Sequence, residues 1–307
     1  MVVTQVAGGQ LRELVDEFIG RDIAPGTADS YGYPLRGHFL PWCASRGVTT
    51  PEELVPDVID AFGRMLQAHT TARGTPLRPA SRRTYMKAVQ QFLSWLRQRK
   101  RIEEVDPKLV QLPRRRRQHR QVLSRAEIQQ LEDAARIERD KLIIRIMADT
   151  ATREGGVARL LRTDVIRQDG RYCFLRVADK TGERMPPISA ELYRRLKAHA
   201  EGKTGRPRSG DPHLFLATRR RPGGDYEPLT EDGLYQAVRD VAARARLGKR
   251  VYPHLLCHSA LTWMVNERGI SPIVVAESTG RSLSVIMEYY NHPSDQQRWE
   301  AMRQLWA

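Results

Sequence analysis

Apolar residues recur at helical spacing throughout the first 112 residues. Residues 11–19 place theirs on one helical face, and residues 27–47 repeat the pattern with two prolines interrupting it. The segment 50–69 opens with an N-cap threonine, a proline at the first helical position and acidic side chains in the first turn, which favour a helix. We therefore expect a mainly α-helical domain over residues 1–112.

The strongest helical pattern, residues 81–102, is also the most basic part of this domain. One stripe of the expected helix is apolar and consists of Tyr85, Ala88, Val89, Phe92, Leu93, Trp95 and Leu96. The remaining surface is strongly basic and includes Arg82, Arg83 and Lys87. We expect the apolar stripe to pack in the core and these three cations to contact a polyanion.

The pattern changes after residue 122. A capping-box signature at Ser124 opens a helical pattern that runs to Ile166. Strand-like residues 170–179, a KTGE turn and the segment RMPPIS then predict a hairpin, and residues 211–219 are a further candidate strand. Helical patterns resume and continue to the C-terminus. This order predicts an α+β domain with a small antiparallel sheet over residues 122–307.

Residues 113–121, PRRRRQHRQ, separate the two predicted domains. The run holds too much like charge to fold by itself, which indicates a linker. Two interpretations stay open. The linker is either a solvated flexible joint or a strap that lies on DNA phosphates through Arg114, Arg115, Arg116 and Arg117.

The charge balance favours a nucleic-acid partner. Lys and Arg number 51 against 36 Asp and Glu, which gives a net charge of +15 and a pI near 10.2. A folded protein that tolerates this self-repulsion usually has a polyanionic partner, and we expect double-stranded DNA.

Other classes of protein are disfavoured by the same sequence. Cys43, Cys173 and Cys257 are far apart and form no CxxC pair, which argues against a disulfide scaffold and a zinc ribbon. No run of 18 apolar residues occurs, and the N-terminus lacks a basic region followed by an apolar stretch. We expect a cytoplasmic protein with no membrane partner.

Five chemically active side chains follow one another in the C-terminal domain. They are Arg153 in ATREGG, Lys180 in the KTGE turn, His254 in HLLCH, Arg281 in STGRS and Tyr290 in EYYNHP. Taken singly, each arginine or lysine is most simply interpreted as one of 51 solvated basic side chains. The alternative for the whole set is an unrelated nucleic-acid binder in which this order of residues is a coincidence. The ordered set resembles the tyrosine recombinase or phage integrase family, and the resemblance covers nearly the whole chain.

Further positions carry this resemblance. Beyond the five side chains, the family motifs match at Asp164, Val165, Leu256, His258, Gly280 and His292. Tyr290 follows Arg281 by nine residues, the family spacing for the nucleophile, and Tyr289 is the alternative one residue away. The resemblance implies a SAM-like helical core-binding domain, the basic linker and an α+β catalytic domain.

The resemblance also implies a route for cutting and rejoining DNA without a cofactor or metal. The hydroxyl of Tyr290 would attack the scissile phosphate to give a 3′-phosphotyrosine, and a free 5′ hydroxyl would later reverse the step. Arg153 would bind the nonbridging oxygens and Lys180 would protonate the leaving 5′ oxygen. His254 would assist the nucleophile or bind phosphate.

Three positions depart from the family pattern. Cys257 stands where HxLRH has its second arginine, Arg281 stands where His or Trp is usual, and Gly156 replaces an acidic residue. Losing one preorganised contact typically costs on the order of 10²–10³ in rate. Two questions stay open. Either Arg281 compensates for the missing second arginine or the activity is weakened. Either Glu154 supplies the acidic partner of Arg153 or that partner is lost. The alternative function is a weakened or inactive DNA-binding accessory factor of the same fold.

The segment HLLCH also permits a zinc interpretation. His254, Cys257 and His258 are zinc-ligand types at i, i+3 and i+4, but a structural site needs a fourth ligand and the chain offers no matching pair. We expect no metal.

The last segment, residues 295–307, predicts an amphipathic helix. Trp299, Met302, Leu305 and Trp306 share one face. In relatives such a tail docks on a neighbouring protomer, so we expect self-association on DNA, from dimer to tetramer. Packing on its own domain is the alternative.

Overall fold

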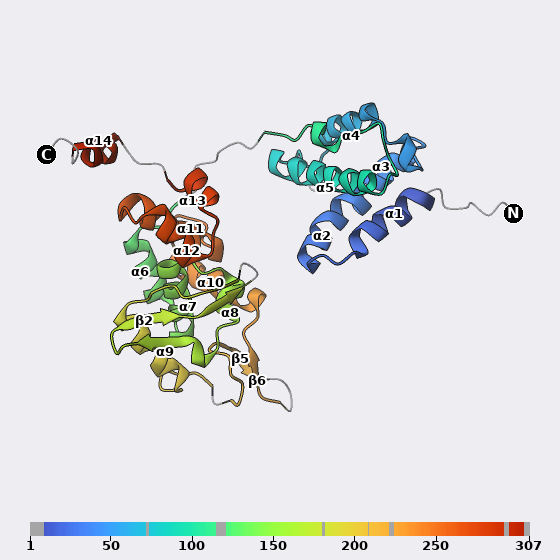
Figure 1. The fold of residues 1–307 in the computed structure, drawn as a ribbon. Coiled ribbons are helices and arrows are strands. Elements are labelled where there is room, and N and C mark those ends of the chain that lie inside the picture. The colour runs from blue at the N-terminus through green and yellow to red at the C-terminus, as the bar shows by residue number, and fades with distance from the viewer. Residues whose placement is uncertain are drawn as a thin grey trace. The chain divides into compact units, whose positions relative to one another are not determined.

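A computed structural model describes residues 9–71, 74–114, 121–179, 182–207, 209–220, 224–291 and 295–303. The chain divides into two compact units, residues 1–118 and 119–307 (Figure 1). Each unit buries its own hydrophobic core. The first is helical and the second combines helices with small antiparallel strand pairs, which confirms the predicted fold class.

The described part of the first unit is built from helices. They are α1 (Gly9–Gly20), α2 (Pro25–Pro34), α3 (Leu40–Ser45), α4 (Pro56–Ala68) and α5 (Pro79–Gln98), with short 3₁₀ turns at Pro51–Glu53 and Pro107–Leu109. A π-helical turn, Leu35–Phe39, joins α2 to α3. The prolines expected to interrupt a helix, Pro34 and Pro41, therefore lie on either side of this change in winding.

Helix α5 confirms the predicted apolar stripe. Its residues from Ala88 to Leu96 that face the core are buried, and Tyr85 packs against the same core at its edge. The rings of Phe92 and Trp95 lie 5.5 and 5.7 Å from that of Phe18 on α1, edge to face. This aromatic contact joins the first helix of the unit to the last long one.

The second unit surrounds its strands with helices. These are α6 (Arg125–Ala134), α7 (Glu138–Thr150), α8 (Glu154–Ala158), α9 (Ala190–Ala200), α10 (Glu231–Ala245), α11 (Pro253–Thr262), α12 (Pro272–Thr279), α13 (Leu283–Tyr289) and α14 (Asp295–Arg303), with a 3₁₀ turn at Arg162–Asp164 and a π-helical turn at Trp263–Glu267. The predicted capping box is present: the Ser124 hydroxyl accepts from the Glu127 backbone, and the Glu127 carboxylate accepts from the Ser124 backbone at 2.7 Å.

The strands in the described part of this unit form three antiparallel pairs. They are β1 (Val165–Gln168) with β2 (Tyr172–Leu175), β3 (Val177–Asp179) with β4 (Gly182–Arg184), and β5 (Leu216–Arg220) with β6 (Tyr226–Pro228). Strand β1 corrects the sequence prediction, which continued a helix to Ile166. Helix α7 ends where Ala151 adopts a left-handed φ of 52°, and the β-branched pair at 165–166 favours the extended pairing with β2.

Burial of His199 makes the stability of the second unit depend on pH. His199 is 2% exposed on α9, and burial, with Arg206 nearby, lowers its pKa to about 4. An unfolded histidine titrates near 6.5, so the unfolded chain takes up the proton first as the pH falls. The unfolding free energy should therefore drop between about pH 6.5 and pH 4, by up to about 3 kcal/mol.

Urea unfolding at pH 7, 5.5 and 4 measures this drop. The variant His199→Gln, which cannot take up the proton, should lose a corresponding part of the pH slope. An unchanged slope in the variant would show that His199 is not its source.

Candidate active site

Segments far apart in the sequence meet at the C-terminal end of α7. After Thr150 the chain turns through Ala151 and Thr152 into Arg153, which precedes α8. The carbonyl of Ala151 accepts a hydrogen bond from Nη1 of Arg281 at 3.0 Å, and the carbonyl of Thr152 accepts from Sγ of Cys257 at 3.0 Å. Consecutive carbonyls thus fix two side chains from α11 and the α12–α13 turn beside one another.

Arg281 enters the core because α12 ends sharply. Gly280 adopts φ 62°, the left-handed conformation that favours glycine at a helix C-terminus, and Arg281 follows directly. Only 9% of Arg281 is exposed. Burial lowers the pKa of this guanidinium, and the positive charges of Arg153 and Arg184 lower it further, which indicates that the three groups lie close together.

Asp179 supplies a carboxylate next to these arginines. Its side chain is 3% exposed, its Oδ2 accepts from Nη1 of Arg184 at 2.8 Å, and it lies 3.8 Å from Nη1 of Arg153. A Cβ at Gly156 would lie 2.9 Å from a methyl group of Thr152 and 3.6 Å from Oδ2 of Asp179. A carboxylate from β3 therefore fills the space beside Gly156. The described ion pair of Arg153 is with Asp179, a partner that neither of the two alternatives for the missing acidic residue named.

Arg184 is a residue that the sequence analysis missed. It ends β4, and its side chain is 6% exposed. Within the described residues its Nε and Nη2 have no hydrogen-bond partner, and the same holds for Nη1 of Arg153 and Nη2 of Arg281. The three arginines, named here the arginine cluster, therefore bury unsatisfied N–H donors in one place, an arrangement suited to an oxyanion.

Cys257 lies beside the arginine cluster as a neutral thiol. It is fully buried, and burial raises its pKa to about 12 although the charge of Arg281 acts in the opposite direction. A neutral thiol at this position supplies none of the donors of a guanidinium.

Tyr290 directly follows α13 and is also buried. Its hydroxyl lies 3.2 Å from Nδ1 of His258, the two ring centroids are 5.2 Å apart, and Tyr290 is 5% exposed. Its charge state also affects the pKa of Arg281, so the phenol lies near the arginine cluster. Tyr289 in contrast is 36% exposed.

Comparison with known proteins identifies the family of this fold. The model of the phage integrase family matches residues 121–297. The chain belongs to the phage integrase family.

Curated relatives are tyrosine recombinases. Tyrosine recombinase XerD of Chlorobaculum tepidum is 27% identical over 284 residues, which are 89% of this chain and 87% of XerD. Tyrosine recombinase XerC 2 of Ralstonia nicotianae is 25% identical over 270 residues, 83% of this chain and 74% of the relative. The family assignment supports a role in site-specific recombination.

Solved structures share the fold at low sequence identity. The Tn1549 transposon integrase in complex with transposon right end DNA has a TM-score of 0.71 at 14% identity and covers 97% of this chain and all of its own. XerH recombinase bound to palindromic difH substrate has a TM-score of 0.70 at 19% identity, covering 96% of this chain and 84% of its own. Both of those proteins were solved in complex with DNA, and their likeness to this chain lies in the fold.

Of the remaining residues expected from the family pattern, only His254 lies among the described residues of the site. His254 lies in the first turn of α11, one turn before His258, and is exposed. Lys180 and His292 lie outside the described residues. Arg153, Arg281 and Tyr290 thus come together in the described part of the site, with His258 and Asp179 as partners that the sequence analysis gave no role.

The expected DNA contacts of the first unit lie along α5. Lys87 is exposed and its Nζ donates to Gln90 at 2.7 Å, whereas Arg83 donates to the carbonyl of Pro113 at 2.8 Å. Arg82 is half-buried and its Nε has no partner among the described residues. Arg114 lies outside any helix or strand and is exposed, and Arg115, Arg116 and Arg117 lie outside the described residues.

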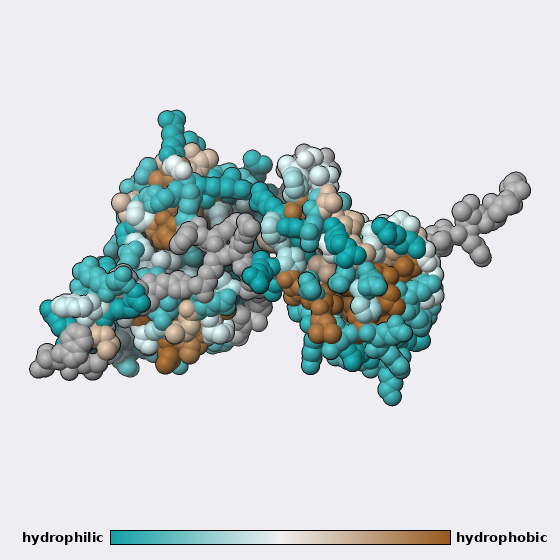
Figure 2. Space-filling model, turned by 90° about the horizontal axis from the view of Figure 1, so that it is seen from above, coloured by the Kyte–Doolittle hydropathy of each residue, from teal (hydrophilic) through white to brown (hydrophobic). Residues whose placement is uncertain are grey.

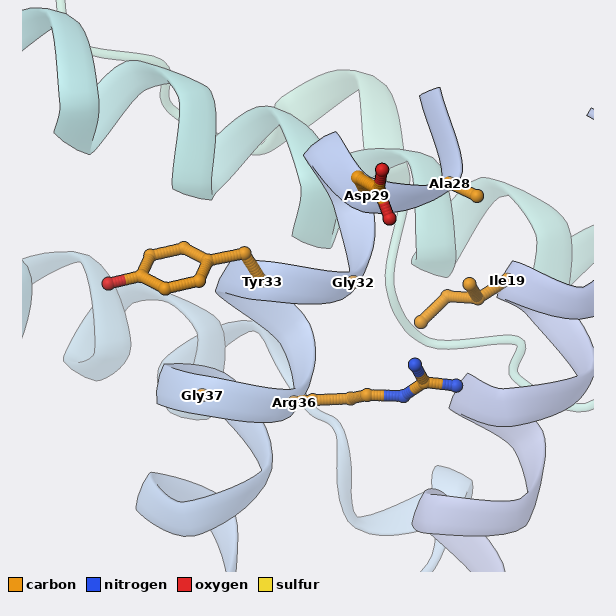
Figure 3. A pocket seen from close by; sticks show the side chains of 7 residues that line it. All are labelled: Ile19, Ala28, Asp29, Gly32, Tyr33, Arg36 and Gly37. Atoms are coloured by element: carbon orange, nitrogen blue, oxygen red, sulfur yellow. The ribbon is translucent and has the colours of Figure 1, made fainter. Parts of the chain in front are cut away.

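A shallow hollow in the first unit is a poorer candidate for a site. Figure 3 shows Arg36 extending toward Ile19 while the Tyr33 ring points away from the hollow. The Arg36 guanidinium is already bound to Asp16 at 2.7 Å. The hollow therefore offers little for a ligand to bind.

A clustered set of metal ligands and a membrane-spanning helix are both absent from the residues that the structure describes. Over the described ranges, no group of three or more His, Cys, Asp or Glu side chains is placed to hold a metal ion. No helix in the described residues is long and apolar enough to cross a membrane.

The burial of the cysteines predicts low reactivity in the folded protein. With a pKa of about 12, Cys43 and Cys257 would be thiolate only to about 10⁻⁴ at pH 8, and both are almost fully buried. A thiol reagent at pH 8 should modify neither in the folded chain and both in urea. Fast labelling that is lost in Cys257→Ser would contradict the described burial.

Proposed function

We propose that this protein is a site-specific recombinase that cleaves and rejoins DNA through Tyr290. The observation that carries the proposal is the burial of the Tyr290 hydroxyl next to His258 and the arginine cluster. A nucleophile and several phosphate-binding cations come from separate segments of the chain to one place. Phosphodiester transfer needs this combination.

The proposed step balances without an external energy source. Oη of Tyr290 attacks the scissile phosphorus, the bond from phosphorus to the 5′ oxygen breaks, and the 3′ phosphate becomes a tyrosine ester. The leaving 5′ oxygen takes a proton, for which we assign Lys180 in the turn after β3. The phenol proton would pass to His258, whose Nδ1 lies 3.2 Å from Oη of Tyr290. His254 at the exposed end of the same helix would assist the nucleophile or bind phosphate. Attack by a 5′ hydroxyl of another strand reverses the step.

Arg281 would take over the phosphate contact of the missing second arginine. Its guanidinium and the Cys257 thiol bind consecutive carbonyls, so Arg281 lies next to the position where the family carries that arginine. Arg153 would supply the other guanidinium, oriented by Asp179. In this interpretation a cation is moved from α11 to the α12–α13 turn, and the total positive charge at the site is kept.

We assign DNA binding to both units. Residues 1–112 would form the core-binding domain, with Arg82, Arg83 and Lys87 of α5 on phosphates, and residues 122–307 the catalytic domain. The linker 113–121 would add Arg114 to Arg117. Phosphate contacts of this kind position a protein on DNA without reading sequence.

Self-association on DNA is part of the proposal. Figure 2 shows separate hydrophobic areas on a mostly hydrophilic surface. Large apolar side chains are exposed on α12, α13 and α14, namely Ile273, Val274, Leu283, Val285, Met287, Trp299 and Met302. Leu305 and Trp306 lie outside the described residues. The structural relatives include a lambda integrase dimer bound to a COC′ core site and a tetramer bound to a Holliday junction, so we propose dimers to tetramers here.

One observation favours a second candidate function. Cys257 is a neutral buried thiol at the position of a phosphate-binding arginine. If Arg281 does not compensate, the chain would be a DNA-binding accessory factor of weak or absent catalysis.

Trapping the covalent intermediate tests the nucleophile. Duplexes selected by the protein from a randomised pool, nicked so that the short 5′ fragment diffuses away, should accumulate a protein–DNA adduct. The adduct should vanish in Tyr290→Phe and persist in Tyr289→Phe, the matched control. The reverse pattern would move the nucleophile by one residue, and binding without any adduct would favour the accessory factor.

A double-mutant cycle tests the exchange of the arginine. Arg281→His should lower the rate of adduct formation by about 10²–10³ with DNA affinity nearly unchanged. Cys257→Arg should add a like charge beside Arg281 and bring no gain, whereas the double variant Cys257→Arg with Arg281→His should regain most of the rate. Cys257→Ser is the control of equal size. A gain of about 10²-fold in Cys257→Arg alone would mean that Arg281 does not compensate.

A further inference from the structure

Arg184 combines deep burial with few described hydrogen-bond partners. Its side chain is 6% exposed, yet only Nη1 has a described partner, Asp179 at 2.8 Å. Guanidinium groups carry five N–H donors, and buried donors are nearly always satisfied in folded proteins. Within the described residues, Nε and Nη2 of Arg184 have no partner.

The two unsatisfied nitrogens are the ones that form a fork. The hydrogens of Nε and Nη2 leave the same edge of the planar guanidinium, and this edge matches two oxygens of a phosphate. Asp179 holds the group by Nη1 and so restricts its rotation. The fork is thus preorganised and has no acceptor among the residues that the structure describes.

The charges around Arg184 identify the missing acceptor as an anion. Arg153 and Arg184 both pair with the carboxylate of Asp179. The positive charge of Arg184 also lowers the pKa of Arg281, so the two guanidinium groups lie near each other. Glu154 is a further acidic side chain near Cys257. The unsatisfied donors of Arg153 and Arg281 are also buried there, so a tetrahedral oxyanion would satisfy donors of all three arginines at once.

We propose that Arg184 is a third phosphate-contacting arginine of this site, which binds nonbridging oxygens of the phosphate that Tyr290 attacks. Asp179 is a positioning residue that holds Arg184 and Arg153. The identity of the phosphate as the scissile one rests on the proposed function, whereas the anion site itself does not. An anion-binding test can therefore separate the two.

The catalytic test uses the full chain with Arg184→Lys and Arg184→Gln. Lysine keeps the charge beside Asp179 but lacks the fork, so both variants should form the covalent adduct about 10²-fold more slowly while DNA affinity stays within a few-fold. Arg176→Gln is the matched control, because Arg176 is 41% exposed and paired with Asp164. It should react like the wild type.

The binding test needs no DNA. Inorganic phosphate, compared with potassium chloride at equal ionic strength, should raise the Tm of the wild type and of Arg176→Gln in a saturable way. Both Arg184 variants should lose this response, and their Tm in chloride reports whether they fold.

The outcomes of the two tests are distinguishable. A wild type that forms no adduct, but whose phosphate response depends on Arg184, would overturn the proposed function and support the anion site. Wild-type rate and phosphate response in Arg184→Lys would overturn the role of Arg184, as would a wild type that shows no phosphate response.

Discussion

Burying several guanidinium groups together is the constraint on which the rest of this site depends. Like charges in a poorly hydrated place repel, and each group that leaves water loses its hydration. The protein opposes this cost with one buried carboxylate, Asp179, and with the backbone carbonyl of Ala151. Among the described residues, these partners do not satisfy all the donors of the cluster, and the remaining donors define what the described part of the site lacks. An anion that arrives with its substrate would complete the electrostatic balance.

The backbone turns that end α7 and α12 make this arrangement possible. Ala151 and Gly280 both adopt left-handed conformations. Arg281 follows Gly280 directly and is buried, whereas Arg153 comes two residues after Ala151 and is partly exposed. The hydrogen bond from Arg281 to the Ala151 carbonyl then joins the two turns. The turns that end these two helices thus also position the arginines of the site.

Departures from the family pattern are explained by what replaces them in space. A residue with a side chain at 156 would meet Thr152, and the vacated space is occupied by the carboxylate of Asp179. The Cys257 thiol and the guanidinium of Arg281, from the turn between α12 and α13, bind the neighbouring carbonyls of Thr152 and Ala151. In the proposed assignment, both exchanges keep the local charge and change the segment that carries it.

Much of the fold was predictable because local signals agree with the structure. The capping box at Ser124 and the apolar stripe of α5 are examples of such signals. Strand β1 was not predictable, because its apolar residues continue a helical pattern. Arg184 and Asp179 were also hidden, since burial and pairing are set by the β3–β4 fold, and one arginine among 51 basic residues carries no local mark.

The central claim is that one oxyanion bridges the three arginines beside Tyr290. The most direct measurement is a crystal of the full chain soaked in tungstate, located by its anomalous signal. We expect the tungsten between Arg153, Arg184 and Arg281, with oxygens within hydrogen-bond distance of Nε or Nη2 of Arg184. Tungstate bound only elsewhere, with those nitrogens bonded to protein or water, would contradict it.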